Sequence, residues 1–202
     1  SEIRYGINKL NPFCSDPFKY VLKADLTQRC DFTNIFVKGA TDILNDDKTQ
    51  LKSQGHLTNG IQTAGNIFTK GGDVIEQIKK IIYVELEKYR LYFKDSEEGL
   101  IKNWPTDYNI NGWLVSMKSG GELASHMHDV GWITGSIYIN VPPKLNTDSG
   151  NLVVGLNDEK NGSGGKQNRQ SIDVVTGSLC LFPSSLLHST IPFESEEKRI
   201  VL

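Results

Sequence analysis

Short strand-like runs, each followed by turn residues, fill the second half of this chain from Pro105 onward. Within each run apolar residues are continuous or alternate with polar ones, and Gly, Pro, Asn or Asp separate one run from the next. The predicted strands cover residues 112–117, 132–141, 152–156, 171–175, 177–182 and 198–202. Strands this short and this closely spaced favour a sandwich or barrel over a parallel sheet with crossover helices.

A long amphipathic helix is predicted before the strands. Apolar residues recur every three to four positions from Asp73 to about Phe93, and Lys and Glu lie between them. Gly71-Gly72-Asp73 supplies a plausible N-cap. Residues 1–70 hold only short apolar runs broken by Gly, Asn and Asp, so we predict irregular or mixed structure there.

The size of the chain predicts one domain. With 202 residues and 38% hydrophobic content, it is long enough to bury one core. We expect a mainly β fold with N-terminal helices. Residues 1–105 would form a helical and irregular N-terminal part, and residues 106–202 would form a β-barrel core flanked by the long helix.

Charge and cysteine content limit the expected partners and location. The net charge is −2, and no run of Lys or Arg is long enough to follow a phosphate backbone, so we expect no nucleic-acid partner. A small-molecule or protein/peptide substrate fits better, and a homodimer stays open. Cys14, Cys30 and Cys180 lie far apart without CxxC spacing, which suits a reducing, cytoplasmic location. No charged-then-apolar leader and no membrane-length apolar stretch is seen, so we expect neither a signal peptide nor a membrane span.

Three of the four histidines occur where a barrel could bring them around one metal ion. His126 and His128 are two residues apart, so in a strand both side chains face the interior while Met127 and Asp129 face away. His188 follows a buried run, 177–183, that predicts a strand ending in a turn. Neutral imidazoles at these positions suit Fe, Zn, Cu, Mn or Ni. The alternative is that these are surface or core histidines without a metal.

Arg199 lies within the last strand-like run. A guanidinium carried into an apolar barrel needs an anionic partner, and its planar fork suits a carboxylate. Tyr138, on a predicted strand shortly after the HxH, could donate its hydroxyl to the same carboxylate. The alternatives are an exposed Arg199 paired with Glu196 or Glu197, and a Tyr138 that only packs in the core.

Taken together, these motifs resemble the 2-oxoglutarate and Fe(II)-dependent oxygenases. The order of motifs is HxH at 126–128, the runs 134–140, 149–152 and 177–183, then His188 and Arg199. More narrowly, it resembles the group that has HxH in place of HxD and is related to the prolyl-hydroxylase branch. The resemblance covers about residues 107–202 and extends more loosely to residue 57 and the helix.

The resemblance implies a double-stranded β-helix, a jelly-roll or cupin-like barrel. It implies Fe(II) held at the barrel mouth by His126, His128 and His188, with Arg199 and Tyr138 anchoring the distal carboxylate of 2-oxoglutarate. The activity would be hydroxylation by dioxygen coupled to decarboxylation of 2-oxoglutarate.

The chain departs from the family pattern at the position of the usual carboxylate ligand, which is His128. We therefore predict a three-histidine site and keep Asp129 as an alternative ligand, which requires the strand to end or bulge at His128. The family's last strand usually continues further, so we expect this chain to stop short at Leu202.

Two other functions stay open: a cupin-type metalloprotein that does not use 2-oxoglutarate, and a non-catalytic β-barrel binding module. His56 is predicted to be a surface or capping residue. Trp113 and Trp132 are predicted to pack in the core or to line a substrate pocket. Loops 141–150 and 157–169 would determine which substrate the protein binds.

Overall fold

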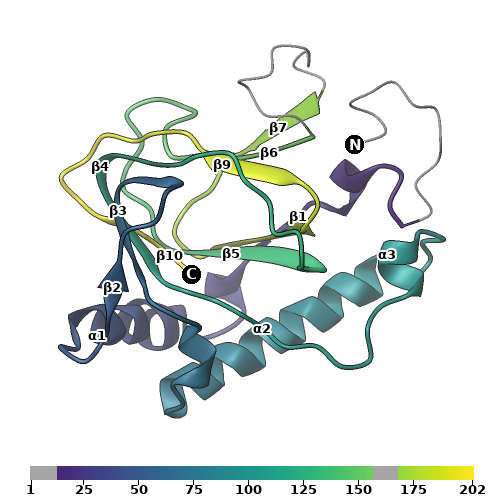
Figure 1. The fold of residues 1–202 in the computed structure, drawn as a ribbon, viewed down its shortest axis with the longest axis horizontal. Coiled ribbons are helices and arrows are strands. Elements are labelled where there is room, and N and C mark those ends of the chain that lie inside the picture. Colours follow the sequence, from purple (N-terminus) through teal and green to yellow (C-terminus); the bar gives the residue numbers. More distant parts are fainter. Residues whose placement is uncertain (1–12, 157–167) are drawn as a thin grey trace.

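Two antiparallel sheets build the protein in the computed structural model, which describes residues 13–156 and 168–202 (Figure 1). Within these residues the larger sheet has the order β1-β8-β5-β10-β4-β3-β2 and the smaller sheet the order β7-β6-β9. The strands are β1 Leu22–Asp25, β2 Leu51–Lys52, β3 Leu57–Thr63, β4 Val115–Leu123, β5 Ile133–Asn140, β6 Leu152–Gly155, β7 Arg169–Ile172, β8 Ser178–Pro183, β9 Leu187–Thr190 and β10 Arg199–Val201. The helices are α1 Gly39–Asn45, α2 Asp73–Tyr92 and α3 Gly99–Lys102. The predicted mainly β class with N-terminal helices is confirmed.

Strand β8 separates two apolar cores. All of its residues are buried, and side chains alternate between the two faces of a strand. Leu179 and Leu181 pack in an outer core between the larger sheet and the helices. Cys180 and Phe182 pack in an inner core between the two sheets, together with Tyr138 from β5. The interior between the sheets is therefore a packed, largely apolar environment.

Helix α2 confirms the predicted amphipathic helix. It follows Gly72, whose positive φ of 101° is the kind of backbone conformation that glycine adopts readily. Its buried residues include Ile78 and Tyr89, which belong to the outer core. The Tyr89 hydroxyl donates a hydrogen bond to the Tyr20 carbonyl at 2.7 Å. The helix is thus fixed along the outer side of the larger sheet (Figure 1).

The N-terminal half also contributes strands, which the prediction of irregular structure for residues 1–70 did not include. β1 pairs with β8, and β3 pairs with β4 in a ladder that runs from Leu57 opposite Leu123 to Gln62 opposite Val115. β3 carries Asn59 and Gly60 in its middle, where its register with β4 shifts. Such a strand lacks regular alternation, and it forms because β4 offers a free edge for pairing.

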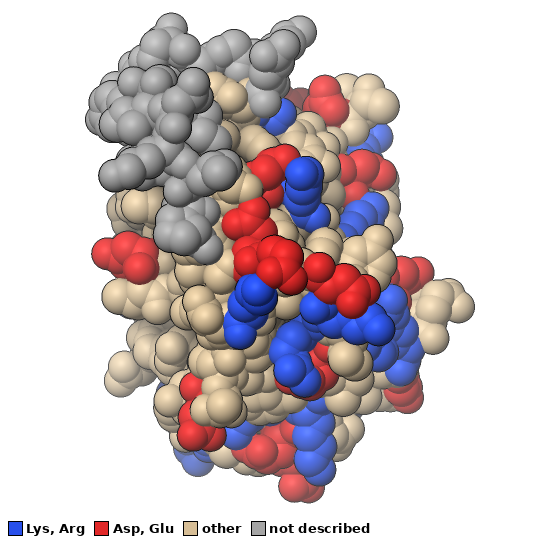
Figure 2. All heavy atoms as spheres, turned by 90° about the vertical axis from the view of Figure 1, so that its right-hand side faces the viewer, with Lys and Arg blue, Asp and Glu red and all other residues tan. Residues whose placement is uncertain are grey.

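Charges of both signs occur next to one another on the face shown in Figure 2. They therefore compensate each other locally on that face. Among the described residues, no helix has the length and apolar character needed to cross a bilayer.

Candidate metal centre

Backbone hydrogen bonds hold the three histidines of the predicted site close together. His126 and His188 form an antiparallel bridge. The His126 N–H donates to the His188 carbonyl at 3.1 Å, and the His188 N–H donates to the His126 carbonyl at 2.8 Å. The His128 N–H donates to the carbonyl of Ser184, just past β8, at 3.3 Å. Pairing with β9 and with the residue after β8 thus fixes the backbone positions of His126 and His128.

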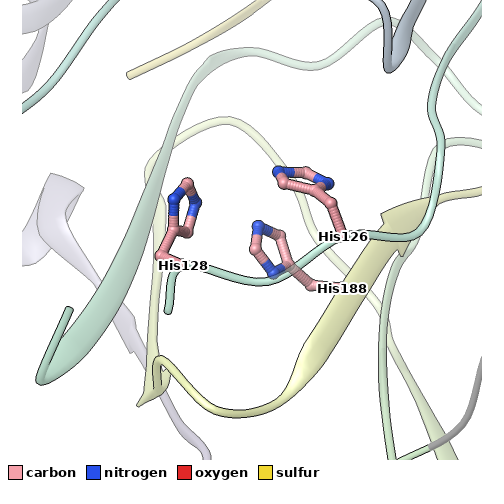
Figure 3. A group of neighbouring side chains, drawn as sticks. All are labelled: His126, His128 and His188. Atoms are coloured by element: carbon pink, nitrogen blue, oxygen red, sulfur yellow. The ribbon is translucent and has the colours of Figure 1, made fainter. Parts of the chain in front are cut away.

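The three imidazole rings converge (Figure 3). Ring centroids are 4.2 Å apart for His126 and His188, 5.1 Å for His128 and His188, and 5.3 Å for His126 and His128. One nitrogen from each ring lies within 4.8 Å of the others. Ligands bonded at about 2.1 Å to one ion are at most about 4.2 Å apart. Small side-chain movements would therefore close this group around a metal.

The protonation of the three rings also suits a metal. Burial lowers the pKa of His126 and of His128, and it lowers the pKa of the 5% exposed His188 to about 3, with further lowering from the two neighbouring rings. All three are therefore neutral at pH 7. His126 Nδ1 donates to the Ala124 carbonyl at 2.8 Å, which leaves the Nε2 lone pair free to bind.

The structure does not bring Asp129 into this group. Asp129 is exposed and does not belong to the cluster of converging ligand atoms. His126 forms the bridge to β9, whereas His128 lies in irregular backbone before a turn, so strand alternation explains only part of the arrangement. Met127 still faces outward, with 51% of its surface exposed.

Arg199 is buried, and the interpretation as an exposed arginine paired with Glu196 or Glu197 is wrong. It is 1% exposed, on β10 opposite Met117 of β4. Its Nη1 donates to the Gly150 carbonyl, whereas its Nε and Nη2 have no hydrogen-bond partner among the described residues. Burial lowers the pKa of Arg199. A buried guanidinium with two unpaired nitrogens lacks an acceptor, and a carboxylate fits that requirement.

Tyr138 lies beside Arg199. Its ring centroid is 5.1 Å from the guanidinium carbon, and the residue is 1% exposed. Burial raises the pKa of its hydroxyl, so Tyr138 is a neutral donor at pH 7. The two predicted cofactor-binding residues are therefore neighbours in the interior.

One inner surface connects the histidines with Arg199. Val115 and Met117 of β4 and Trp113, two residues before this strand begins, are at alternate positions and pack into a common apolar cluster. The Trp113 ring is 5.7 Å from that of His128, and Met117 is opposite Arg199. The metal-ligand candidates and the anion-binding candidate thus face the same interior.

Comparison with protein families finds a match for the C-terminal part of the chain. Residues 111–202 match the model of a family described as "Putative 2OG-Fe(II) oxygenase". This part of the chain is similar to the 2-oxoglutarate and Fe(II)-dependent oxygenases, as its order of motifs predicted. The match favours the oxygenase over the cupin-type alternative. No curated protein sequence matches the chain significantly.

Solved structures of such oxygenases share the fold. A Pseudomonas putida prolyl-4-hydroxylase is 13% identical, with a TM-score of 0.58 over 90% of this chain and 88% of that one. A Trichoplax adhaerens prolyl hydroxylase, in complex with a hypoxia inducible factor peptide, is 11% identical, with a TM-score of 0.62 over 90% and 80%. The epimerase SnoN, in complex with Fe3+, α-ketoglutarate and nogalamycin RO, is 10% identical, with a TM-score of 0.63 over 92% and 78%. The predicted double-stranded β-helix is confirmed.

The two tryptophans near the oxygenase site have different surroundings. Trp113 contacts His128, as described above. Trp132 packs in the outer core, where its Nε1 donates to the Leu100 carbonyl at 3.0 Å and its ring lies 4.8 Å from that of Phe13. Core packing accounts for Trp132, and Trp113 remains a candidate for the substrate side.

Loop 141–150 adjoins Arg199. It follows Asn140 at the end of β5, and Asn140 is opposite Ile200 in the register of β10. The loop ends at Gly150, which accepts the Arg199 hydrogen bond. The other proposed substrate loop, 157–169, falls largely outside the described residues.

Gly150 is a site residue that the sequence analysis missed. Its φ is +70°, and a Cβ there would lie 2.5 Å from Arg199 Nη1. Gly150→Ala should therefore displace the guanidinium and weaken 2-oxoglutarate binding about tenfold or more, while metal affinity is retained. Gly65→Ala is the matched control, because Gly65 has a φ of +72° and nothing within 4 Å. Equal 2-oxoglutarate affinities of the two variants, measured by calorimetry, would contradict the role of Gly150.

Proposed function

We propose that the protein hydroxylates an unactivated C–H bond of a small-molecule or peptide substrate. Bound Fe(II), 2-oxoglutarate and dioxygen supply the oxidation, in which 2-oxoglutarate is decarboxylated to succinate. One observation carries the proposal: the buried Arg199 has two nitrogens without a hydrogen-bond partner among the described residues, and it faces the same interior as three converging, neutral histidines. A cytoplasmic location, a homodimer and independence from nucleic acid stay predictions of the sequence.

His126, His128 and His188 would hold the metal. Three protein ligands leave positions open for a co-substrate and for dioxygen, as in facial sites that combine two histidines with a carboxylate. The unpartnered Nε and Nη2 of Arg199 would bind the distal carboxylate of 2-oxoglutarate, and the Tyr138 hydroxyl would donate to the same group. The apolar wall between them, including Met117, keeps water away from this carboxylate and strengthens its binding.

The three-histidine set predicts a particular charge balance. Neutral imidazoles leave the full metal charge uncompensated by the protein, unlike a set that includes a carboxylate. The carboxylate at the metal-binding end of 2-oxoglutarate would supply part of that compensation, since the distal carboxylate pairs with Arg199. We therefore expect metal and 2-oxoglutarate to increase each other's affinity, as linkage requires when each stabilises the other's bound state.

His128→Asp should strengthen Fe(II) binding by about tenfold, about 1.4 kcal/mol. The change restores an anionic ligand at the position where the family usually has one. Anaerobic calorimetric titration with Fe(II) measures it. Asp129→Asn is the matched control and should leave the affinity unchanged, because Asp129 is exposed and outside the cluster. A large loss in Asp129→Asn would instead make Asp129 a ligand.

Anaerobic titration of the Fe(II)-loaded protein with 2-oxoglutarate tests the proposed function. A weak visible charge-transfer band is expected, together with succinate formation when dioxygen is admitted. Iron binding without the band would favour a cupin-type metalloprotein. Absence of any tight Fe, Mn, Ni or Zn binding would favour a non-catalytic module.

A further inference from the structure

All four histidines of the chain belong to one continuous group. Besides the three converging rings, the His56 ring stacks on the His126 ring, with centroids 5.3 Å apart and an interplanar angle of 13°. The exposed His56 lies in the turn just before β3, 70 positions before His126 in the sequence. His56 does not belong to the converging ligand group itself. Its role therefore differs from that of the three candidate ligands.

The backbone holds His56 at this position. The β3–β4 ladder extends to Leu57 opposite Leu123, and the Ala124 N–H donates to the His56 carbonyl at 2.7 Å. The Ala124 carbonyl in turn accepts the hydrogen bond from His126 Nδ1 at 2.8 Å. Ala124 thus connects the backbone of His56 directly to the ring of His126. Strand pairing therefore places the backbone of His56 next to His126, and its exposed ring lies parallel to the His126 ring.

The stacked ring adds to the Nδ1 hydrogen bond in opposing one motion of the His126 ring. Rotation of the His126 ring about its Cβ–Cγ bond would turn Nε2 away from the other two histidines. A parallel ring at 5.3 Å opposes this rotation, because the edge of His126 would turn toward the face of His56. Restricting ligand rings in this way matters most where no charged ligand helps to hold the metal.

We propose that His56 is a positioning residue of the metal centre, which acts through His126 by stacking. The inference rests on the proposed function in so far as the three histidines bind a metal. It does not require His56 to bind the metal or to change its protonation. A flat side chain of another type should therefore replace it.

Two substitutions separate stacking from other roles. His56→Ala removes the ring, and His56→Phe keeps a flat ring without nitrogens; both keep the backbone carbonyl that binds Ala124. Mn(II) is the probe, measured by calorimetry on the full chain. We expect about 3- to 10-fold weaker binding in His56→Ala and a change of less than about twofold in His56→Phe. Thr58→Ala, an exposed position two residues further along the chain on β3, is the control and should match the wild type.

Two results would overturn the proposal: unchanged Mn(II) affinity in His56→Ala, or a loss in His56→Phe as large as in His56→Ala. A metal-free measurement separates this inference from the proposed function. The NMR signal of the His126 Cε1 proton should shift in His56→Ala and shift less in His56→Phe, because an aromatic ring current is lost in the first and kept in the second. If the wild type binds no metal, the proposed function fails while this spectrum still decides whether the rings stack. An unchanged His126 signal in His56→Ala overturns the inference even if the wild type binds Mn(II) and 2-oxoglutarate.

Discussion

His188→Ala is expected to abolish tight metal binding, with a loss of affinity greater than about 100-fold. His188 is the most buried of the three histidines, at 5% exposed, and its ring is the nearest neighbour of both others. Removing it takes away the nitrogen between His126 and His128, so the remaining two rings would form only a weak pair of ligands. Anaerobic titration with Fe(II), followed by calorimetry, measures the change.

Met127→Leu is the control for this substitution. Met127 lies between the other two histidines in the sequence, but its side chain faces solvent and should not affect the metal. Thermal denaturation of the metal-free proteins checks that His188→Ala remains folded, since the residue is buried in β9. A folded His188→Ala protein with wild-type iron affinity would show that the three histidines are not the metal centre.

Arg199→Met is expected to remove 2-oxoglutarate binding while iron binding is retained. The variant loses a buried, charge-assisted interaction of about 3 kcal/mol or more, which corresponds to over about 100-fold in affinity. The loss should appear as an Fe(II)-loaded protein in which 2-oxoglutarate no longer produces the charge-transfer band. Arg199→Lys should lie in between, because it keeps the charge and loses the planar fork.

A surface variant serves as the control for effects that the loss of any arginine would have on 2-oxoglutarate binding. Arg90→Met changes an arginine on α2 that forms a half-exposed ion pair with Glu87, and it should bind 2-oxoglutarate like the wild type. Arg199→Met also removes the donor to the Gly150 carbonyl, so folding must be checked by circular dichroism. Normal 2-oxoglutarate affinity in a folded Arg199→Met protein would show that the anchor is elsewhere.

Sequence patterns predicted correctly those helices and strands whose formation depends on residues close together in the sequence. The spacing of apolar residues predicted α2, because a helix brings positions three and four apart onto one face. The alternating and continuous apolar runs predicted strands β4 to β8 and β10, and thus the mainly β class. They did not predict β1, β2, β3 and β9. For β1 and β3 the reason is clear. Those strands are stabilised by partners more than 50 residues away in the sequence, Leu181 for β1 and Val115 for β3.

Some features of the candidate site could likewise be predicted from the sequence, and others could not. The sequence by itself named the three histidines, Arg199 and Tyr138, since a metal needs neutral imidazoles and a buried guanidinium needs an anion. Only the tertiary structure decided that Arg199 is buried, with two of its three nitrogens unpaired among the described residues, and that Asp129 is exposed to solvent. Only the tertiary structure also brought Gly150 against Arg199 and His56 against His126. These contacts arise from strand pairing and loop closure between residues distant in the sequence, which no local pattern records.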